Sequence, residues 1–381
     1  MVEQFIDREQ ELSTLREFFQ SDRFELIMLY GRRRVGKTEL IKHAAEPFSH
    51  LYYLAIEENN LSRFARECIQ YDSSFRQFRQ DYEVLFEALK NKVQIVIIDE
   101  FQNMIKENPA IISLFQALVD LILKSSKIKL VLLGSSTSIM QSRVLEYSSP
   151  LYGRRTASIL VNPMTFHQMQ GFFSKANFLE MAEIYGFADG IPAYLQEVAV
   201  PFWDWLYKNL VSLKSIFRDE VDFLLRYEFD NPSMYRQILN AIAHGKTKLN
   251  EIKQYIAVQR TDISPYLRNL IEIGLVFREV PVTESEQSRL GRYYIRDNFI
   301  KFWFRFIYPS LSALEGGFFQ IEKIQAQYPS YMGFVFEQIA RQHLITHPIF
   351  PFTKIGRWWG AAGEIDIVAL DPDTPRILFG S

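Results

Sequence analysis

Phe24-Glu-Leu-Ile-Met-Leu-Tyr30 opens the stretch of sequence from which the fold is predicted. It is followed directly by Gly31-Arg-Arg-Arg-Val-Gly36-Lys37-Thr38 and then by Glu39-Leu-Ile-Lys-His-Ala-Ala45. The order predicts a buried strand, a glycine-bounded loop and the start of a helix, the setting in which G-x-x-x-x-G-K-[ST] holds a phosphate chain. The two glycines let the backbone come close to phosphate oxygens, toward which amide N–H groups and the helix N-terminus point.

The side chains of this loop have separate expected roles. Lys37 is expected to reach the β and γ phosphates, and Thr38 to place its hydroxyl on Mg²⁺. The alternative is an ordinary strand–turn–helix connection that contains a lysine, and the flanking strand and helix argue against it. The residues predicted to bind the nucleotide here are Gly31, Arg34, Val35, Gly36, Lys37, Thr38 and Glu39.

A second apolar run, Val93-Gln-Ile-Val-Ile-Ile98, ends in Asp99-Glu100. An unbroken apolar run is typical of a strand covered on both faces of a parallel sheet. Because ligands sit beyond the carboxyl ends of such strands, Asp99 is expected beside Thr38, where it would orient the magnesium. Glu100 is expected to accept a proton from the water that attacks the γ-phosphate. The alternative is an acidic pair that only caps the next turn.

Two later segments carry polar side chains. Ile128-Lys-Leu-Val-Leu-Leu133 leads to Gly134-Ser135-Ser136, where either serine could hold the attacking water or a γ-phosphate oxygen. Ser149-Pro-Leu-Tyr-Gly153-Arg154-Arg155 offers two arginines that could neutralise charge on the transferred phosphoryl group, from this chain or a neighbouring subunit. Surface arginines in a loop are the alternative. An Asn-Lys-x-Asp guanine-reading segment does not follow the acidic strand, which disfavours a GTPase.

The composition describes a globular protein. At 381 residues, with 48% hydrophobic and 15% aromatic residues, the chain is long enough for two or three domains. The single cysteine, Cys68, excludes a disulfide framework and fits a reducing compartment. The N-terminus lacks a signal-peptide pattern and apolar runs stay below the roughly 18 residues that span a bilayer, so we expect a cytoplasmic protein without a membrane partner. With a formal net charge of −2, nucleic acid would need a local basic patch.

A set of segments along the chain carries a family resemblance: Phe5–Leu12, Tyr30–Thr38, Ile98–Gln102, Gly134–Ser136, Ser149–Arg154 and Asp189–Leu195. Together they resemble the archaeal-type ATPase family, within the AAA-related signalling ATPases of the STAND class. The resemblance implies an additional-strand P-loop core with a helical lid that binds ATP. It also implies that Asp7 and Arg8 lie near the adenine, and that Gly190 and Pro192 close over the nucleotide from the lid. In this chain Asp189 replaces the usual glycine before Gly190.

From Val221 the pattern becomes that of a winged helix-turn-helix. The predicted elements are helices at Ser233–His244, Lys248–Tyr255 and Thr261–Ile273, and strands at Leu275–Val282 and Arg289–Arg296. Gly274 ends the third helix as a C-cap glycine would. Because useful DNA affinity needs several phosphate contacts, a DNA-contacting role and a protein-contacting or packing role both stay open. The cations near the third helix and the wing are Arg260, Arg268, Arg278, Arg289 and Arg292.

The C-terminal part begins with the densely aromatic run Asp297–Pro309, which predicts an inter-domain core helix rather than a platform for stacking bases. Further on, Glu364 and Asp366 share one face of a predicted strand and, with Glu337, could bind a divalent metal. This arrangement is similar to the PD-(D/E)xK nuclease-like domain that accompanies the same ATPase family. Such a nuclease needs a following Glu-x-Lys strand, and this chain ends at Arg376–Ser381. Either the domain is truncated or it lacks its lysine, and in both cases we expect no nuclease activity from this chain.

The sequence therefore predicts an α/β fold with a P-loop NTPase core of the additional-strand, AAA-like type. A helical lid, a winged helix and a small α+β nuclease-like domain are expected to follow the core. The predicted boundaries are 1–165 for the core, 166–220 for the lid, 221–296 for the winged helix, and 297–381 for the aromatic segment with the nuclease-like domain.

The expected function is Mg²⁺-dependent ATP hydrolysis by a STAND-like ATPase whose nucleotide state moves the winged-helix and C-terminal domains. Two alternatives stay open: a nucleotide-gated binding or scaffold protein with negligible turnover, and an ATPase that drives nucleic-acid processing. Besides the nucleotide, the candidate partners are DNA, another protein and a second copy of the chain. The predicted catalytic residues are Lys37, Glu100, Ser135, Arg154 and Arg155, and the predicted metal ligands are Thr38 and Asp99.

Overall fold

The computed structural model describes residues 5–258, 261–371, 373–374 and 376–380. It divides into two compact units, Met1–Pro163 and Met164–Ser381, and each unit is described by itself. Arg260, one of the cations predicted near the third helix of the winged-helix pattern, lies outside the described residues.

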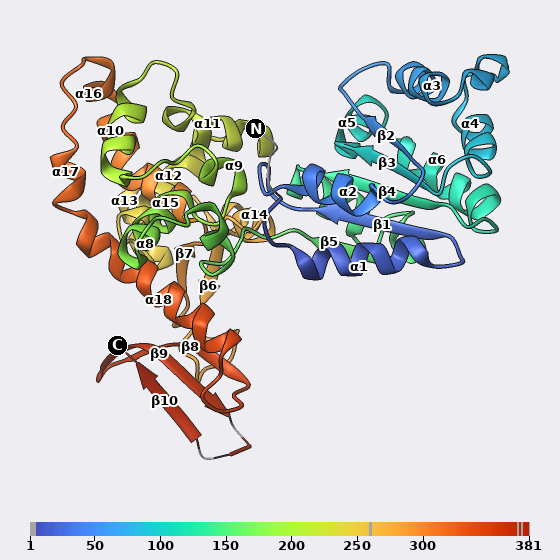
Figure 1. The fold of residues 1–381 in the computed structure, drawn as a ribbon. Coiled ribbons are helices and arrows are strands. Elements are labelled where there is room, and N and C mark those ends of the chain that lie inside the picture. The colour runs from blue at the N-terminus through green and yellow to red at the C-terminus, as the bar shows by residue number, and fades with distance from the viewer. Residues whose placement is uncertain (1–4, 259–260, 372, 375, 381) are drawn as a thin grey trace. The chain divides into compact units, whose positions relative to one another are not determined.

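The first unit is built on the strands β1 (Glu25–Tyr30), β2 (His50–Leu54), β3 (Ile95–Asp99), β4 (Lys129–Gly134) and β5 (Ala157–Leu160). They form one parallel sheet in the order β2-β3-β4-β1-β5 (Figure 1). All residues of β3 and β4 are buried, as their apolar runs predict. Since β4 is inserted between β1 and the acidic strand β3, the sheet confirms the predicted additional-strand core.

Helices surround this sheet and bury aromatic rings. They are α1 (Glu9–Gln20), α2 (Lys37–Ala45), α3 (Asn60–Tyr71), α4 (Tyr82–Leu89), α5 (Phe101–Glu107), α6 (Ile111–Leu118) and α7 (Thr137–Ile139). Phe64 of α3 stacks on Phe86 of α4 with ring centroids 5.3 Å apart, and Phe86 meets Phe115 of α6 edge-on at 5.8 Å. This packing joins helices that are distant in sequence into one core beside the sheet.

The second unit is mainly helical. Its helices are α8 (Phe178–Ala188), α9 (Pro192–Leu195), α10 (Phe202–Val211), α11 (Glu220–Glu228), α12 (Ser233–Ala243), α13 (Leu249–Tyr255), α14 (Ser264–Glu272), α15 (Asn298–Phe302), α16 (Leu311–Glu315), α17 (Glu322–Gln325) and α18 (Tyr328–Thr346). In the described part of the chain, every helix is too short or too polar to cross a membrane.

Two small antiparallel sheets complete this unit. One pairs β6 (Val276–Glu279) with β7 (Arg292–Ile295). The other contains β8 (Lys354–Gly360), β9 (Gly363–Asp371) and β10 (Arg376–Gly380) in the order β10-β9-β8, and α18 leads into it (Figure 1). The β6–β7 pair is shorter than the two strands predicted at 275–282 and 289–296, because the residues between β6 and β7 form a loop.

The aromatic run packs in the interior of the second unit. α15 begins at Asn298 because Asp297 caps it, with a carboxylate oxygen that accepts the Ile300 N–H at 2.8 Å. The helix continues as a π-helical segment, Trp303–Ile307. Its rings are buried, as the predicted core role requires, so they present no exposed platform to bases.

Phe187 of α8 is the centre of the aromatic core. Its ring lies 5.0 Å from that of Phe302 and 5.6 Å from that of Phe299. We predict that Phe187→Ala lowers the free energy of unfolding by about 3–5 kcal/mol, because the lost ring leaves a cavity. The control, Phe318→Ala, removes a ring that is 67% exposed and should cost less than about 1 kcal/mol. Guanidinium denaturation followed by tryptophan fluorescence measures the free energy of unfolding of both variants. Equal losses in the two variants would show that Phe187 is not at the centre of the aromatic core.

Candidate nucleotide-binding site

The loop between β1 and α2 has a backbone that needs glycine at two positions. Gly31 has φ +150°, and a Cβ added there would lie 2.4 Å from the carbonyl oxygen of Val161. Gly36 has φ +89° and is the residue before α2. Both conformations are ones that a residue with a side chain adopts only with strain. The glycines of the motif are therefore required by the loop itself.

Lys37 begins α2 and turns back over this loop. Its Nζ donates hydrogen bonds to the carbonyl oxygens of Gly31, at 2.8 Å, and Arg32, at 2.9 Å. The side chain is only 5% exposed. The ammonium thus lies inside the curve of the loop, which is the position from which it can contact a phosphate chain bound there.

Thr38 and Asp99 lie side by side. The Thr38 hydroxyl donates to Asp99 Oδ2 at 2.7 Å, and the Tyr52 hydroxyl donates to the same oxygen at 2.8 Å. The Glu100 N–H donates to Asp99 Oδ1 at 2.8 Å. Asp99 is 2% exposed, so three neutral donors fix a buried carboxylate next to the loop.

Tyr52 belongs to this site although the sequence patterns did not single it out. It lies on β2, next to β3, opposite Ile97. Burial and the negative charge of Asp99 raise the pKa of Tyr52, so the phenol stays protonated and donates to the carboxylate. A tyrosine in an apolar strand gives no signal of this role before the strand order is known.

Glu100 is held at the start of α5 in the left-handed region, with φ +55°. Its Oε2 accepts hydrogen bonds from the Ser135 hydroxyl, at 2.5 Å, and from the side-chain amide of Gln102. Ser135 follows β4, so the additional strand brings it to this carboxylate. Gln102 is a second residue that the sequence patterns left without a role.

The N-terminal segment reaches the same loop. Arg8 is 4% exposed, and its guanidinium donates to the carbonyl oxygens of Val35, at 3.2 Å, and Asn162, at 2.7 Å. Asp7 accepts the Arg8 N–H at 2.6 Å. These contacts bring the Asp7–Arg8 pair, which the family resemblance associates with adenine, against the backbone of the phosphate loop.

The other predicted loop residues occupy distinct positions. Arg34 has φ +68°, and Val35 is fully buried. Glu39 lies in the first turn of α2, where its carboxylate is 3.6 Å from the Lys42 ammonium. Arg34 thus takes a left-handed backbone conformation in the loop, and Val35 contributes a buried apolar side chain.

The two candidate arginine fingers have partners elsewhere in the first unit. Arg154 forms a two-pronged ion pair with Asp120, with donor–acceptor distances of 2.6–2.9 Å, and these hydrogen bonds raise the pKa of the guanidinium. Arg155 donates to the Leu145 carbonyl oxygen at 3.1 Å and lies over the Tyr152 ring at 4.3 Å. Within the described residues, neither arginine bonds to the phosphate loop, Asp99 or Glu100.

The predicted lid residues belong to the second unit. Asp189 has φ +54°, and its carboxylate accepts the N–H groups of Gly190, at 2.8 Å, and Asn298, at 2.9 Å. A Cβ added to Gly190 would lie 1.7 Å from the Met164 carbonyl oxygen, so only glycine fits there. Pro192 starts α9. Asp189 thus takes a strained conformation that the usual glycine would adopt without cost.

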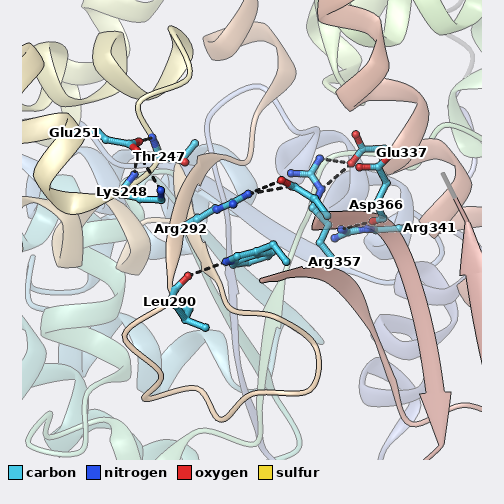
Figure 2. A network of polar contacts seen from close by, with 11 residues as sticks. Thr247, Lys248, Glu251, Leu290, Arg292, Glu337, Arg341, Arg357 and Asp366 are labelled. Carbon is cyan, nitrogen blue, oxygen red and sulfur yellow. Dashed lines mark hydrogen bonds and ion pairs between the residues drawn. The ribbon is translucent and has the colours of Figure 1, made fainter. Parts of the chain in front are cut away.

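The three C-terminal carboxylates do not form the suggested metal site. Glu337 is paired with Arg357, and both oxygens of Glu364 accept from Arg292 at 2.9 Å (Figure 2). Burial raises the pKa of Glu337 despite the opposing charge of Arg357. Over all residues that the structure describes, His, Cys, Asp and Glu side chains nowhere gather in a group of three able to hold a metal ion. An arginine is thus paired with Glu337 and another with Glu364, in place of a metal ion.

Comparison with known proteins identifies the two parts of the chain separately. Residues 5–198 match a family described as an ATPase domain predominantly from Archaea. Residues 303–381 match a family described as archaea bacterial proteins of unknown function. The uncharacterized protein MJECL04 of Methanocaldococcus jannaschii is 50% identical over 380 residues, which covers 98% of this chain and 86% of the relative.

Two solved structures share the fold. The Walker-type ATPase paby2304 of Pyrococcus abyssi superimposes with a TM-score of 0.60 at 22% identity, over 80% of this chain and 97% of that one. The ORC2 protein of Aeropyrum pernix, solved as ADPNP–ADP complexes, gives a TM-score of 0.52 at 14% identity, over 83% and 97% of the two chains. At these identities the likeness shows the fold, whereas the family match and the near-full-length relative show descent. The chain with this phosphate loop and acidic strand belongs to the family of ATPase domains found predominantly in Archaea.

Proposed function

We propose that this chain binds Mg–ATP in the loop between β1 and α2 and hydrolyses it. The single observation that carries the proposal is the 2.7 Å hydrogen bond between Thr38 and Asp99 at the carboxyl edge of the sheet. A hydroxyl and a carboxylate are hard oxygen ligands of the kind that Mg²⁺ prefers. Thr38 and Asp99 would hold the ion, which when bound would supply positive charge against the charge that develops on the phosphates during transfer.

The residues of the chain divide the remaining work. Backbone N–H groups from Gly31 to Thr38 surround the phosphates, and Lys37 exchanges its loop carbonyls for phosphate oxygens. Glu100 takes the proton of the attacking water. Ser135 orients the Glu100 carboxylate, which it contacts at 2.5 Å, and Gln102 supports the same oxygen from α5.

Finer assignments extend this proposal. Asp7 and Arg8 border the adenine, and Gly190 and Pro192 contact the nucleotide from the lid. Nucleotide state changes the arrangement of the winged-helix and C-terminal domains, as in STAND ATPases, in a cytoplasmic protein. The arginine finger is assigned to Arg155 or to Arg154, and Arg154 could act only after its ion pair with Asp120 breaks.

A second candidate is a nucleotide-gated binding protein with negligible turnover. One observation favours it: the Glu100 carboxylate accepts from both Ser135 and Gln102, which keeps this oxygen from accepting a proton from water. In that case ATP would act as a switching ligand only.

Lys37→Ala should weaken ATP binding by roughly 10- to 100-fold, because a charge-assisted contact worth about 1.5–3 kcal/mol is lost. Lys42→Ala is the matched control, since Lys42 lies on the same helix with a side chain about half exposed. Isothermal titration with Mg–ATP measures both affinities. An ATP affinity of Lys37→Ala within twofold of wild type would remove Lys37 from the phosphate site.

Glu100→Gln should lower the rate of phosphate release by at least about 100-fold while ATP affinity stays within about twofold, because the amide cannot accept the proton. Glu58→Gln, at an exposed position, makes the same chemical change elsewhere in the unit. If wild type and Glu100→Gln release phosphate at one trace rate, the switching candidate replaces the ATPase.

Tyr52→Phe should raise the Mg²⁺ concentration needed for half-maximal hydrolysis by roughly 10-fold, because Asp99 loses a hydrogen bond that orients it. Tyr53→Phe is the control, because the neighbouring hydroxyl bonds to Asn60 instead. Magnesium titrations of phosphate release compare the two. Equal Mg²⁺ requirements would show that Tyr52 does not position the carboxylate.

A further inference from the structure

The loop between β6 and β7, which is the wing of the proposed winged helix, is bound to the C-terminal sheet. The Val282 N–H donates to the Arg357 carbonyl oxygen at 2.9 Å. The Trp359 indole N–H donates to the Leu290 carbonyl oxygen at 3.2 Å (Figure 2). From β6, the Glu279 carboxylate accepts from Arg341 of α18 at 2.7 Å. The wing is therefore held at both ends of its loop and along its first strand.

Arg292 of the wing is bound by two residues of the C-terminal sheet, Glu364 and Trp359. Its Nη1 donates to both oxygens of Glu364 at 2.9 Å, and its guanidinium carbon lies 4.5 Å from the centre of the Trp359 ring. Its side chain is 18% exposed. A carboxylate and an aromatic ring give Arg292 the charge and the stacking that a nucleic acid would otherwise supply.

Other cations of the same motif differ in their surroundings. Arg278 of β6 donates to the carbonyl oxygens of Glu286 and Ser288 within the wing loop. Arg268 on α14 and Arg289 in the wing loop are exposed, and neither forms an ion pair with any residue that the structure describes. Of the described arginines near the third helix and the wing, Arg268 and Arg289 are thus exposed to solvent, whereas Arg292 is largely covered by the C-terminal sheet.

We propose that the β8–β9 face of the C-terminal sheet is a binding surface for the wing, and that it competes with duplex DNA for Arg292. Glu364 stands in for a DNA phosphate, and Trp359 fixes the guanidinium plane. This goes beyond the ATPase activity and rests on the proposed winged helix. The C-terminal carboxylates serve as anchors for arginine, and contact of Arg292 with DNA requires that Glu364 release its guanidinium.

The test measures binding of a fluorescently labelled 20-base-pair duplex to the full chain by anisotropy, without nucleotide, over a salt series. Glu364→Gln should free Arg292 for one further phosphate. The slope of log K against log salt should then steepen by about 0.9, which at 0.1 M salt corresponds to roughly eightfold tighter binding. Because nucleotide is absent, failure of the ATPase proposal leaves this result unchanged.

Glu284→Gln is the matched control, because it removes the same charge from an exposed wing position that forms no ion pair within the described chain. Arg292→Gln breaks the same ion pair as Glu364→Gln without freeing a cation, so it reports any structural damage. The DNA affinity of Arg292→Gln should stay within about twofold of the wild-type affinity. In the double variant, Arg292→Gln should cancel the gain in DNA affinity that Glu364→Gln causes.

The proposal is overturned if Glu364→Gln and Glu284→Gln bind the duplex with the same affinity and salt slope. It is also overturned if the gain survives in the Glu364→Gln/Arg292→Gln double variant, since another group would then contact the phosphate. A complete lack of duplex binding by every variant at about 50 mM salt overturns it as well. A slope steeper by about 0.9 that depends on Arg292 supports it.

Discussion

The hydrogen bond between Thr38 and Asp99 spans the end of β4, a strand that contains neither residue. β1 and β3 are separated by β4, so their ends are two strand spacings, roughly 10 Å, apart. The register aligns Tyr30 with Gly134 and Ile98 with Leu132, which places the three carboxyl ends at one edge. The phosphate loop then carries the start of α2 across the end of β4. Thr38 reaches Asp99 only because this loop closes the gap.

That closure is possible because the loop backbone takes conformations open to glycine. Gly31 passes so near Val161 that a Cβ would collide with the carbonyl oxygen at 2.4 Å. Arg8 then donates to the carbonyl oxygens of Val35 and Asn162, tying the loop to the segment after β5. The fully buried strand β4 ends just before Ser135, and so places the Ser135 hydroxyl within hydrogen-bond distance of Glu100. The contacts that hold the sheet and the phosphate loop together therefore also position the side chains of the candidate site.

Local patterns made much of this predictable. Apolar runs with polar ends identify β3 and β4, and Asp297 marks the start of α15 because a cap acts within three residues. The motif G-x-x-x-x-G-K-[ST] predicts a loop, because each of its glycines is required by the backbone conformation at its own position. Such signals depend on neighbours in sequence. They located the phosphate loop, the acidic strand end and the order of elements without knowledge of any long-range contact.

Side chains whose roles depend on distant partners could not be predicted in the same way. Tyr52 gains its role from Asp99, 47 positions away, and Arg154 gains its partner Asp120 from 34 positions away. The metal site suggested for Glu364 and Asp366 with Glu337 was wrong for the same reason. Spacing on a strand says nothing about the arginines that pair with Glu337 and Glu364.

The decisive difference between the two groups of carboxylates is charge compensation. Asp99 accepts hydrogen bonds only from neutral donors, and no ion pair reaches it from any residue that the structure describes. Glu337 and Glu364 are each matched by an arginine. A cation entering the C-terminal sheet would have to displace a guanidinium and leave it buried without a partner, at a cost of several kcal/mol. A cation arriving beside Thr38 would instead give Asp99 the opposite charge that its neutral hydrogen-bond donors do not supply, and this difference is why we propose a metal site at Asp99 and a structural role for Glu337 and Glu364.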